Sequence, residues 1–243
     1  MSSPHSSIAS PRVPASWPVI IGVLLLRTVL LFATTTALIP VTGSYLNALA
    51  WGNVTIVAVD IISVIVIAAL LRRQGRSLRE LIGAKLSDTG WGLVLWPIAT
   101  IGFVAASFIG NLVAYQGPPP ATTLSVVTPP LLFLALWTTV IMSATVAIAE
   151  EVLYRGWAQT ELTTRTNRGL GLVIMAFFFA LQHAALTPLE LRAQVARFIT
   201  TFLAGLMFGA LYLWRKRLWP LIIAHWLLDV VGLGLPILLA ALS

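Results

Sequence analysis

Apolar residues fill seven long blocks of this chain, and short stretches with Gly, Pro or charged residues separate one block from the next. Each block is close to the roughly 20 residues that a helix needs to cross the hydrocarbon core of a bilayer. The limits that we expect are 17–39, 52–71, 91–114, 131–157, 169–187, 198–214 and 218–241. The fourth block can continue as a helix to residue 164, beyond the membrane. This pattern predicts an all-α fold, a polytopic transmembrane bundle of seven or eight helices.

The composition agrees with a membrane protein. Hydrophobic residues make up 58% of the chain, charged residues make up 9%, and the mean hydropathy is +0.94. This leaves too little polar surface to cover a water-soluble globule. We expect residues 1–15, which are rich in Ser and Pro, to form a disordered cytoplasmic tail, and residues 16–243 to form a single transmembrane domain. The absence of cysteine excludes disulfides, thiolate zinc sites and cysteine nucleophiles.

The net charge of +7 comes from basic residues that follow the second, fourth and sixth blocks. They are Arg72, Arg73, Arg76, Arg79, Lys85, Arg165, Arg168, Arg215, Lys216 and Arg217. The opposite connections, 40–51 and 115–130, contain no charge, and 188–197 contains both signs. The positive-inside rule then predicts a multi-pass protein of the cell membrane with a cytoplasmic amino terminus and, for seven helices, an external carboxyl terminus. Bases spread over loops in this way favour lipid and not nucleic acid as a partner.

Four acidic residues fall inside the apolar blocks, where an ionised carboxylate costs roughly 3 kcal/mol on insertion scales. They are Asp60, Glu150, Glu151 and Asp229. Arg27 and Asp60 are predicted to lie at the same depth, because the first two blocks form an antiparallel hairpin. We interpret them as a structural ion pair outside the active site, with a role in transport as the alternative.

The remaining polar residues are predicted to meet. Glu150 and His183 lie equally far from the turn between their blocks, about 24 Å at 1.5 Å per residue. Residues four apart share a helix face. The pairs with this spacing are Glu151 with Arg155, Phe179 with His183, and His225 with Asp229. We expect these faces to converge on one buried polar pocket, although each histidine alone is equally explained by a hydrogen bond between helices.

Three segments, on the fourth, fifth and seventh blocks, resemble the motifs of the CPBP intramembrane proteases, also called the Abi or CAAX-protease-and-bacteriocin-processing family. They are EEVLYRG, FALQH and HWLLD, which match EExxxR, FxxxH, and HxxxN or HxxxD in that order. The resemblance covers about residues 130–235. It implies a glutamate-dependent endopeptidase of a bacterial plasma membrane, acting on a membrane-associated protein or peptide. The eukaryotic members of the family cleave prenylated CAAX proteins.

The resemblance also implies roles for the motif residues. Glu150 and Glu151 would include the general base that takes a proton from water, and His183 would orient that water. Arg155 would hold the second glutamate in place. His225 would polarise the scissile carbonyl or stabilise the oxyanion. We interpret the motif phenylalanine, Phe179, as a packing residue.

Asp229 stands where asparagine is commoner in the family. An ionised aspartate cannot donate a hydrogen bond to an oxyanion, so Asp229 is predicted to orient His225 instead. Family members have been described both as metalloproteases and as metal-free glutamic proteases, and the glutamates, histidines and aspartate named above are sufficient ligands for zinc. We favour direct activation of water by glutamate without a required cofactor, with zinc as the alternative.

Hydrolysis at membrane depth also needs water, so we expect a conical cavity that opens to the cytoplasm, with an additional sideways opening to lipid as the alternative. Gly205 and Gly209 form a small-xxx-small pair, which predicts close helix packing. Two other functions are compatible with buried ionisable residues. The first is a proton-coupled transporter, which should show repeat symmetry between its halves. The second is a non-catalytic scaffold or bacteriocin-immunity protein.

Overall fold

The computed structural model describes residues 14–119 and 129–242, and every regular element in these two ranges is a helix. Five helices are single elements: α1 (Trp17–Thr42), α2 (Tyr45–Arg73), α4 (Leu86–Tyr115), α8 (Arg168–Ala184) and α9 (Leu191–Arg215). A short helix, α3 (Leu78–Ile82), lies between α2 and α4. The all-α bundle that the sequence predicts is confirmed. The expected disordered tail falls mainly on residues 1–13, which lie outside the described ranges.

Two segments combine α-helical and π-helical stretches. The fourth segment runs through α5 (Leu131–Trp137), η1 (Thr138–Met142), α6 (Ser143–Glu150), η2 (Glu151–Gln159) and α7 (Thr160–Arg165). The last runs through α10 (Trp219–Asp229), η3 (Val230–Gly234) and α11 (Leu235–Leu242). π-Helical turns are rare and are often found at functional sites. Here η2 begins at Glu151 and η3 follows Asp229, so both alter the helical register beside the predicted site residues.

The seven predicted blocks each coincide with one of these helical segments. Among the described residues, six segments are long and apolar enough to cross a membrane, and α8, with 17 residues, is shorter. The fourth segment continues to Arg165, as the sequence predicts. The chain is therefore described here as a multi-pass membrane protein.

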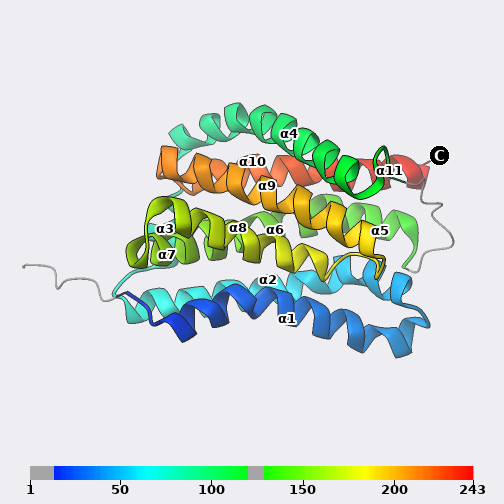
Figure 1. Ribbon diagram of the computed structural model, residues 1–243, viewed down its shortest axis with the longest axis horizontal. Coiled ribbons are helices and arrows are strands. Elements are labelled where there is room, and N and C mark those ends of the chain that lie inside the picture. Colours follow the sequence, from blue (N-terminus) through cyan, green and yellow to red (C-terminus); the bar gives the residue numbers. More distant parts are fainter. Residues whose placement is uncertain (1–13, 120–128, 243) are drawn as a thin grey trace, which may run out of the picture.

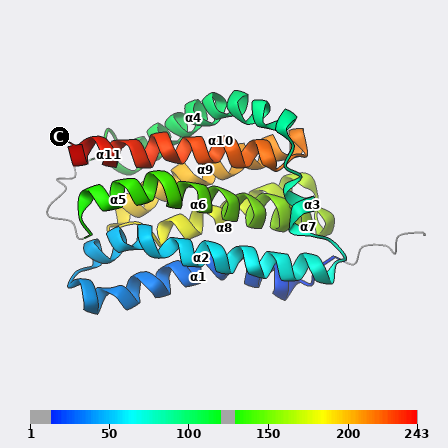
Figure 2. The same ribbon diagram turned by 180° about the vertical axis from the view of Figure 1, so that it is seen from behind.

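The segment that carries the two glutamates lies in the middle of the bundle. Helices α1 and α2 pack together on one side, and α4 lies on the opposite side against α9 and α10 (Figures 1 and 2). Between these layers, α6 and η2 contact α1, α2, α8, α9 and α10. Side chains from five helices can therefore reach the glutamates.

Tight local features set the depth of these helices. The turn between α1 and α2 consists of Gly43, at φ 77°, and Ser44, whose hydroxyl accepts a hydrogen bond from the Asn47 backbone N–H. Glycine adopts this left-handed conformation without steric cost. The turn is centred between Arg27 and Asp60, so the two residues lie at matching depth.

Gly205 and Gly209 allow α9 to approach α8 closely. A Cβ atom at Gly205 would lie 3.1 Å from the Ala176 Cα, and one at Gly209 would overlap Leu172 and lie 2.7 Å from the Met175 Cε. The predicted small-xxx-small contact therefore brings α9 against α8 and places the first half of α9 opposite His183.

Candidate active site

Glu150 is held by polar side chains from two other helices. Its Oε1 accepts hydrogen bonds from Arg27 Nη2 at 3.2 Å and from Gln182 Nε2 at 2.8 Å. Arg27 Nε also donates to Gln182 Oε1 at 2.7 Å. These three side chains form a closed ring of hydrogen bonds, and all three are buried. The ring fixes Oε1, whereas Oε2, which is also buried, has no hydrogen-bond partner among the described residues.

Arg27 and Asp60 form the predicted ion pair, but the pair is not separate from the site. Arg27 Nη1 bonds to Asp60 Oδ1, and the same guanidinium reaches Glu150 through Nη2. The prediction that this pair lies outside the active site is therefore wrong. The sequence places Arg27 and Asp60 at one depth, but only the packing of α1 and α2 against α6 shows that this depth is that of Glu150.

Glu151 orients His225. Its Oε1 lies 2.9 Å from His225 Nδ1 and 3.0 Å from Arg155 Nη1, and the glutamate side chain is fully buried. Because a carboxylate only accepts hydrogen bonds, Nδ1 carries the proton in this contact. Nε2 then faces the other way, 3.8 Å from Glu150 Oε2 and 3.7 Å from Asp229 Oδ2. The imidazole thus presents one nitrogen to Glu150.

Aromatic rings hold Arg155 in place. Its guanidinium carbon lies 4.1 Å from the centre of the Phe179 ring and 5.3 Å from that of Phe208. Such cation–π contacts stabilise a buried guanidinium. The interpretation of Phe179 as a packing residue agrees with this contact, because its ring supports Arg155 and its carbonyl group accepts a 2.8 Å hydrogen bond from His183 Nδ1.

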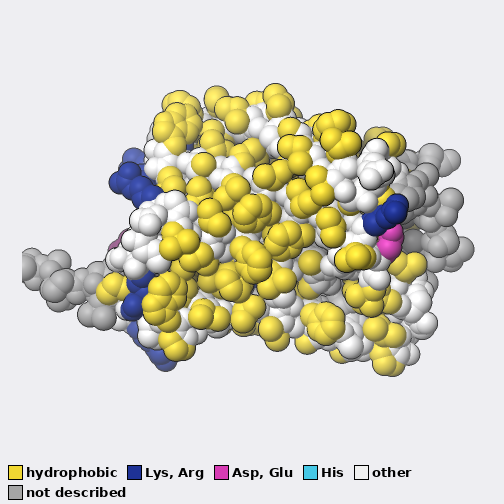
Figure 3. Space-filling model, viewed as in Figure 1, with side chains coloured by type: hydrophobic (Ala, Val, Ile, Leu, Met, Phe, Trp, Pro, Cys, Tyr) yellow, Lys and Arg dark blue, Asp and Glu magenta, His cyan; other side chains and the backbone are white. Residues whose placement is uncertain are grey.

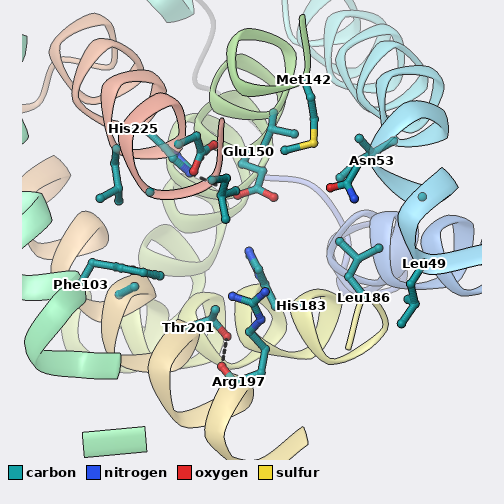
Figure 4. A pocket seen from close by; sticks show the side chains of 18 of the residues that line it. Leu49, Asn53, Phe103, Met142, Glu150, His183, Leu186, Arg197, Thr201 and His225 are labelled. Carbon is teal, nitrogen blue, oxygen red and sulfur yellow. Dashed lines mark hydrogen bonds and ion pairs between the residues drawn. The ribbon is translucent and has the colours of Figure 1, made fainter. Parts of the chain in front are cut away.

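His183 faces Glu150 across a cavity of about 410 Å³ (Figure 4). With Nδ1 donating to the backbone, Nε2 is left to accept a hydrogen bond from a molecule in the cavity. Most of the wall is apolar, and the charged or polar wall residues besides Glu150 and the two histidines include Asn53, Arg197 and Asp229. The volume lies within the range of small-ligand pockets, about 300–1,000 Å³. The cavity is large enough for a short extended peptide segment.

The cavity extends from Glu150 toward the turns that carry few bases. On α2 its wall runs from Leu46 to Ile56, and it begins at Phe179 on α8 and continues to Pro188 in the α8–α9 connection. These residues lie on the side of the α1–α2 and α8–α9 turns (Figure 1). The prediction of a cavity that opens toward the basic loops is therefore wrong. A hydrophobic cluster fills that end, which charge patterning alone could not reveal.

Residues 131–231 match the family model described as type II CAAX prenyl endopeptidase, Rce1-like. This segment is similar to the CAAX-protease family. The match confirms the resemblance carried by the three motifs. No curated protein and no solved structure matches the chain.

The Rce1-like segment contains all six predicted site residues, and the structure brings five of them into one contact network. Glu150, Glu151, Arg155, His225 and Asp229 are linked by the ion pairs described above. The sixth, His183, lies on the facing wall of the cavity. Arg27 and Asp60 precede the Rce1-like segment, so the first hairpin also contributes to the site.

Two polar residues of this region were not singled out by the sequence. Gln182 directly precedes the motif histidine, His183. The sequence feature that could have indicated a role for it is a single amide side chain inside an apolar block. Arg197 lines the cavity from α9, and within the described residues its guanidinium forms no hydrogen bond or ion pair. The sequence feature that could have indicated a role for Arg197 is a basic residue at the end of a connection with few charges. It lies four residues before Thr201, which also lines the cavity.

The arrangement of donors does not fit a zinc ion. Within residues 14–119 and 129–242, no group of three or more His, Asp or Glu side chains is arranged to hold a metal ion. Oε1 of Glu150 faces Arg27 at 3.2 Å, and Oε1 of Glu151 faces Arg155 at 3.0 Å. A divalent cation on these oxygens would be repelled by both guanidinium groups. We therefore derive no step through a metal.

Proposed function

We propose that this protein is an intramembrane endopeptidase in which Glu150 activates water to hydrolyse a peptide bond of a membrane-associated polypeptide. One observation carries the proposal: Oε1 of Glu150 is fixed by two donors, while Oε2 is left unbonded beside a cavity that His183 also lines. A general base must be held rigidly and still be free to take a proton. The match to CAAX proteases over residues 131–231 supports the same class of reaction.

In the proposed reaction, a water molecule donates one hydrogen bond to Glu150 Oε2 and another to His183 Nε2. Glu150 takes a proton from this water while the water oxygen attacks the scissile carbonyl carbon. The resulting tetrahedral intermediate collapses when the C–N bond breaks. Glu150 then returns the proton to the leaving amine, so the carboxylate is regenerated and one water molecule is consumed for each bond cleaved.

His225 is the proposed stabiliser of the oxyanion. Its Nδ1 donates to Glu151, so in its doubly protonated form Nε2 can donate to the oxygen of the tetrahedral intermediate. Glu151 is in turn held by Arg155, which makes both of them positioning residues. Asp229 Oδ2 lies 3.7 Å from Nε2, beyond hydrogen-bond distance.

The test is cleavage of a quenched fluorescent membrane peptide by purified protein in lipid vesicles. The variants are Glu150→Gln, His183→Ala and the control Glu190→Gln, which replaces an exposed glutamate at the start of α9. We expect Glu150→Gln to lower kcat by at least about 1,000-fold and His183→Ala by about 100-fold, in the range of general-base catalysis. Glu190→Gln should behave as wild type.

Size-exclusion chromatography and thermal unfolding establish that each variant is folded. Equal cleavage by wild type and Glu150→Gln would overturn the proposal. The transporter and the non-catalytic scaffold both predict no cleavage by any of the four proteins.

A further inference from the structure

The cavity and the basic residues lie at opposite ends of the bundle. Most of the exposed Lys and Arg side chains visible in Figure 3 lie at the end where α3 and α7 lie in Figure 1, and one basic group lies at the opposite end beside an acidic side chain. The α2–α4, α7–α8 and α9–α10 connections meet at this end, and all ten bases that follow the second, fourth and sixth blocks lie in these connections or in the adjoining helix turns. At the other end, the α8–α9 connection and the first turn of α9 carry Glu190 and Arg192.

The end that carries the bases is closed by packed side chains. Tyr154, Trp157 and Leu162 lie between Glu150 and the α7–α8 turn, and each has an exposed fraction of 0%. They belong to one hydrophobic cluster with Leu71 of α2 and Leu218 at the start of α10. Large apolar side chains in contact leave no path for water or for a peptide. Glu150 is therefore not reached from this end.

The position of the cavity wall on α4, α9 and α10 gives the same direction. Helix α9 runs from the end with few bases toward the basic end, and it lines the cavity between Arg197 and Phe208, in its middle, and not over its last turns at the basic end. Helix α10 runs the opposite way, and its wall residues begin at His225. From α4 the cavity contacts Phe103, in the half of the helix away from the basic end.

The cavity reaches the surface of the bundle at the end with few bases. Leu46 and Leu233 both line the cavity, and they have exposed fractions of 62% and 38%. Leu46 lies in the first turn of α2, next to the α1–α2 turn, and Leu233 lies in η3. A route from this face to Glu150 therefore exists along the inner surface of α2.

Lys and Arg in short loops are retained on the cytoplasmic side of a membrane. From this rule and the position of the cavity, we propose that the catalytic cavity opens on the non-cytoplasmic face of the membrane. If the proposed peptidase function holds, its substrate is a polypeptide segment exposed on that face, such as a translocated chain that remains anchored in the bilayer. This proposal keeps the predicted cytoplasmic amino terminus and external carboxyl terminus. It reverses the predicted side of the membrane from which water and substrate enter the cavity.

The experiment uses the absence of cysteine in the natural chain, which makes single-cysteine variants unambiguous. Met142→Cys reports from inside the cavity, Leu189→Cys from the exposed α8–α9 connection and Thr164→Cys from the exposed basic end. Each full-length variant is labelled in spheroplasts of a bacterial expression host with a small membrane-impermeant thiol reagent. The same labelling is repeated after permeabilisation.

We expect Leu189→Cys and Met142→Cys to react in intact spheroplasts, and Thr164→Cys to react only after permeabilisation. Reaction of Thr164→Cys in intact spheroplasts, with protection of Leu189→Cys, would overturn the orientation. Reaction of Leu189→Cys from outside, with Met142→Cys reactive only after permeabilisation or in neither condition, would overturn the direction of the cavity. Asn53→Cys, on the α2 wall, repeats the Met142 measurement in case that variant does not fold.

Labelling requires no catalysis, so the same pattern is expected in a Glu150→Gln background. A second arm places a quenched peptide either outside or inside right-side-out membrane vesicles. Cleavage of the external peptide alone agrees with the proposal, and cleavage of the internal peptide alone contradicts it. If neither peptide is cleaved while the labelling pattern holds, the peptidase function fails and the side of access stands.

Discussion

Arg27 Nη2 donates a 3.2 Å hydrogen bond to Glu150 Oε1, although the two residues are 123 positions apart in the chain. Arg27 lies on α1, outside the Rce1-like segment at residues 131–231, and it also pairs with Asp60 on α2. The orientation of the proposed base therefore depends on the first hairpin. A fragment limited to the Rce1-like segment would keep all three motifs and lose one of the two donors to Oε1.

Replacing Arg27 should both destabilise the protein and inactivate it. Arg27→Met leaves the carboxylates of Asp60 and Glu150 buried without their cation, and removing one partner of a buried ion pair costs about 3–5 kcal/mol. Arg27→Met with Asp60→Asn removes one of these charges and should recover part of the stability without recovering cleavage. Thermal unfolding in detergent and kcat measure the two effects. Full activity of the stable double variant would show that Arg27 does not position Glu150.

Gln182 should affect catalysis more than binding. Gln182→Met removes the 2.8 Å hydrogen bond to Glu150, and positioning contacts of this kind contribute about 10–100-fold in metal and catalytic sites. We expect kcat to fall by about tenfold with KM nearly unchanged. The matched control is Gln159→Met, another buried glutamine, which donates to the Gly209 carbonyl away from the cavity. A similar fall in kcat for both variants would indicate a general packing defect.

Asp229→Asn should be tolerated. In the structure, Asp229 Oδ2 makes no hydrogen bond within the described residues, and an amide keeps the volume and can donate to an oxyanion. We expect kcat/KM within about threefold of wild type, a change of less than 1 kcal/mol. Glu151→Gln, which removes the charge that holds both His225 and Arg155, should lose about 100-fold by comparison. A severe loss in Asp229→Asn alone would mean that the carboxylate itself is required.

Chelators should leave the activity intact. The guanidinium groups beside Glu150 and Glu151 would repel a divalent cation bound to these carboxylates. Peptide cleavage is therefore expected to be unchanged after incubation with 1,10-phenanthroline and dialysis. Loss of cleavage that added zinc restores would instead assign these carboxylates to a metal.

Arg197 should give the cavity a preference for acidic substrates. Its guanidinium lines the cavity without an ion pair among the described residues, so an anionic group of a bound peptide can pair with it. We expect Arg197→Gln to raise KM for a peptide with an acidic residue by about tenfold, which corresponds to 1.4 kcal/mol. The exposed Arg192→Gln, on the same helix, serves as the control. Equal KM values for acidic and neutral peptides in wild type would contradict the preference.

Much of this architecture could be predicted because a bilayer imposes simple rules. The length of each apolar block predicted its helix, and residues four apart correctly paired Glu151 with Arg155. Counting residues from the turn of the first hairpin also matched Arg27 with Asp60. This counting gives only the position of a residue along the helix axis, however, and not the direction in which its side chain points around that axis. The contact between Arg27 and Glu150 depends on that direction.

The side on which the cavity opens could not be predicted from the sequence for a related reason. Charge patterns report which loops remain in the cytoplasm, whereas an opening exists wherever side chains fail to fill the space between helices. Trp157 and Leu162 fill that space at one end, and nothing in their spacing distinguishes them from lipid-facing residues. Only the packing of α7, η2 and α10 together shows which end is closed.

The cluster around Trp157 also has a consequence for the cell. A hydrolytic site halfway through a membrane must admit water, yet a continuous aqueous path would let protons leak down the electrochemical gradient. The hydrophobic cluster on one side of Glu150 excludes water, and the cavity on the other side admits it, so both requirements are met. Trp157→Ala would therefore let protons leak across the membrane of its host before it changed the proposed hydrolysis.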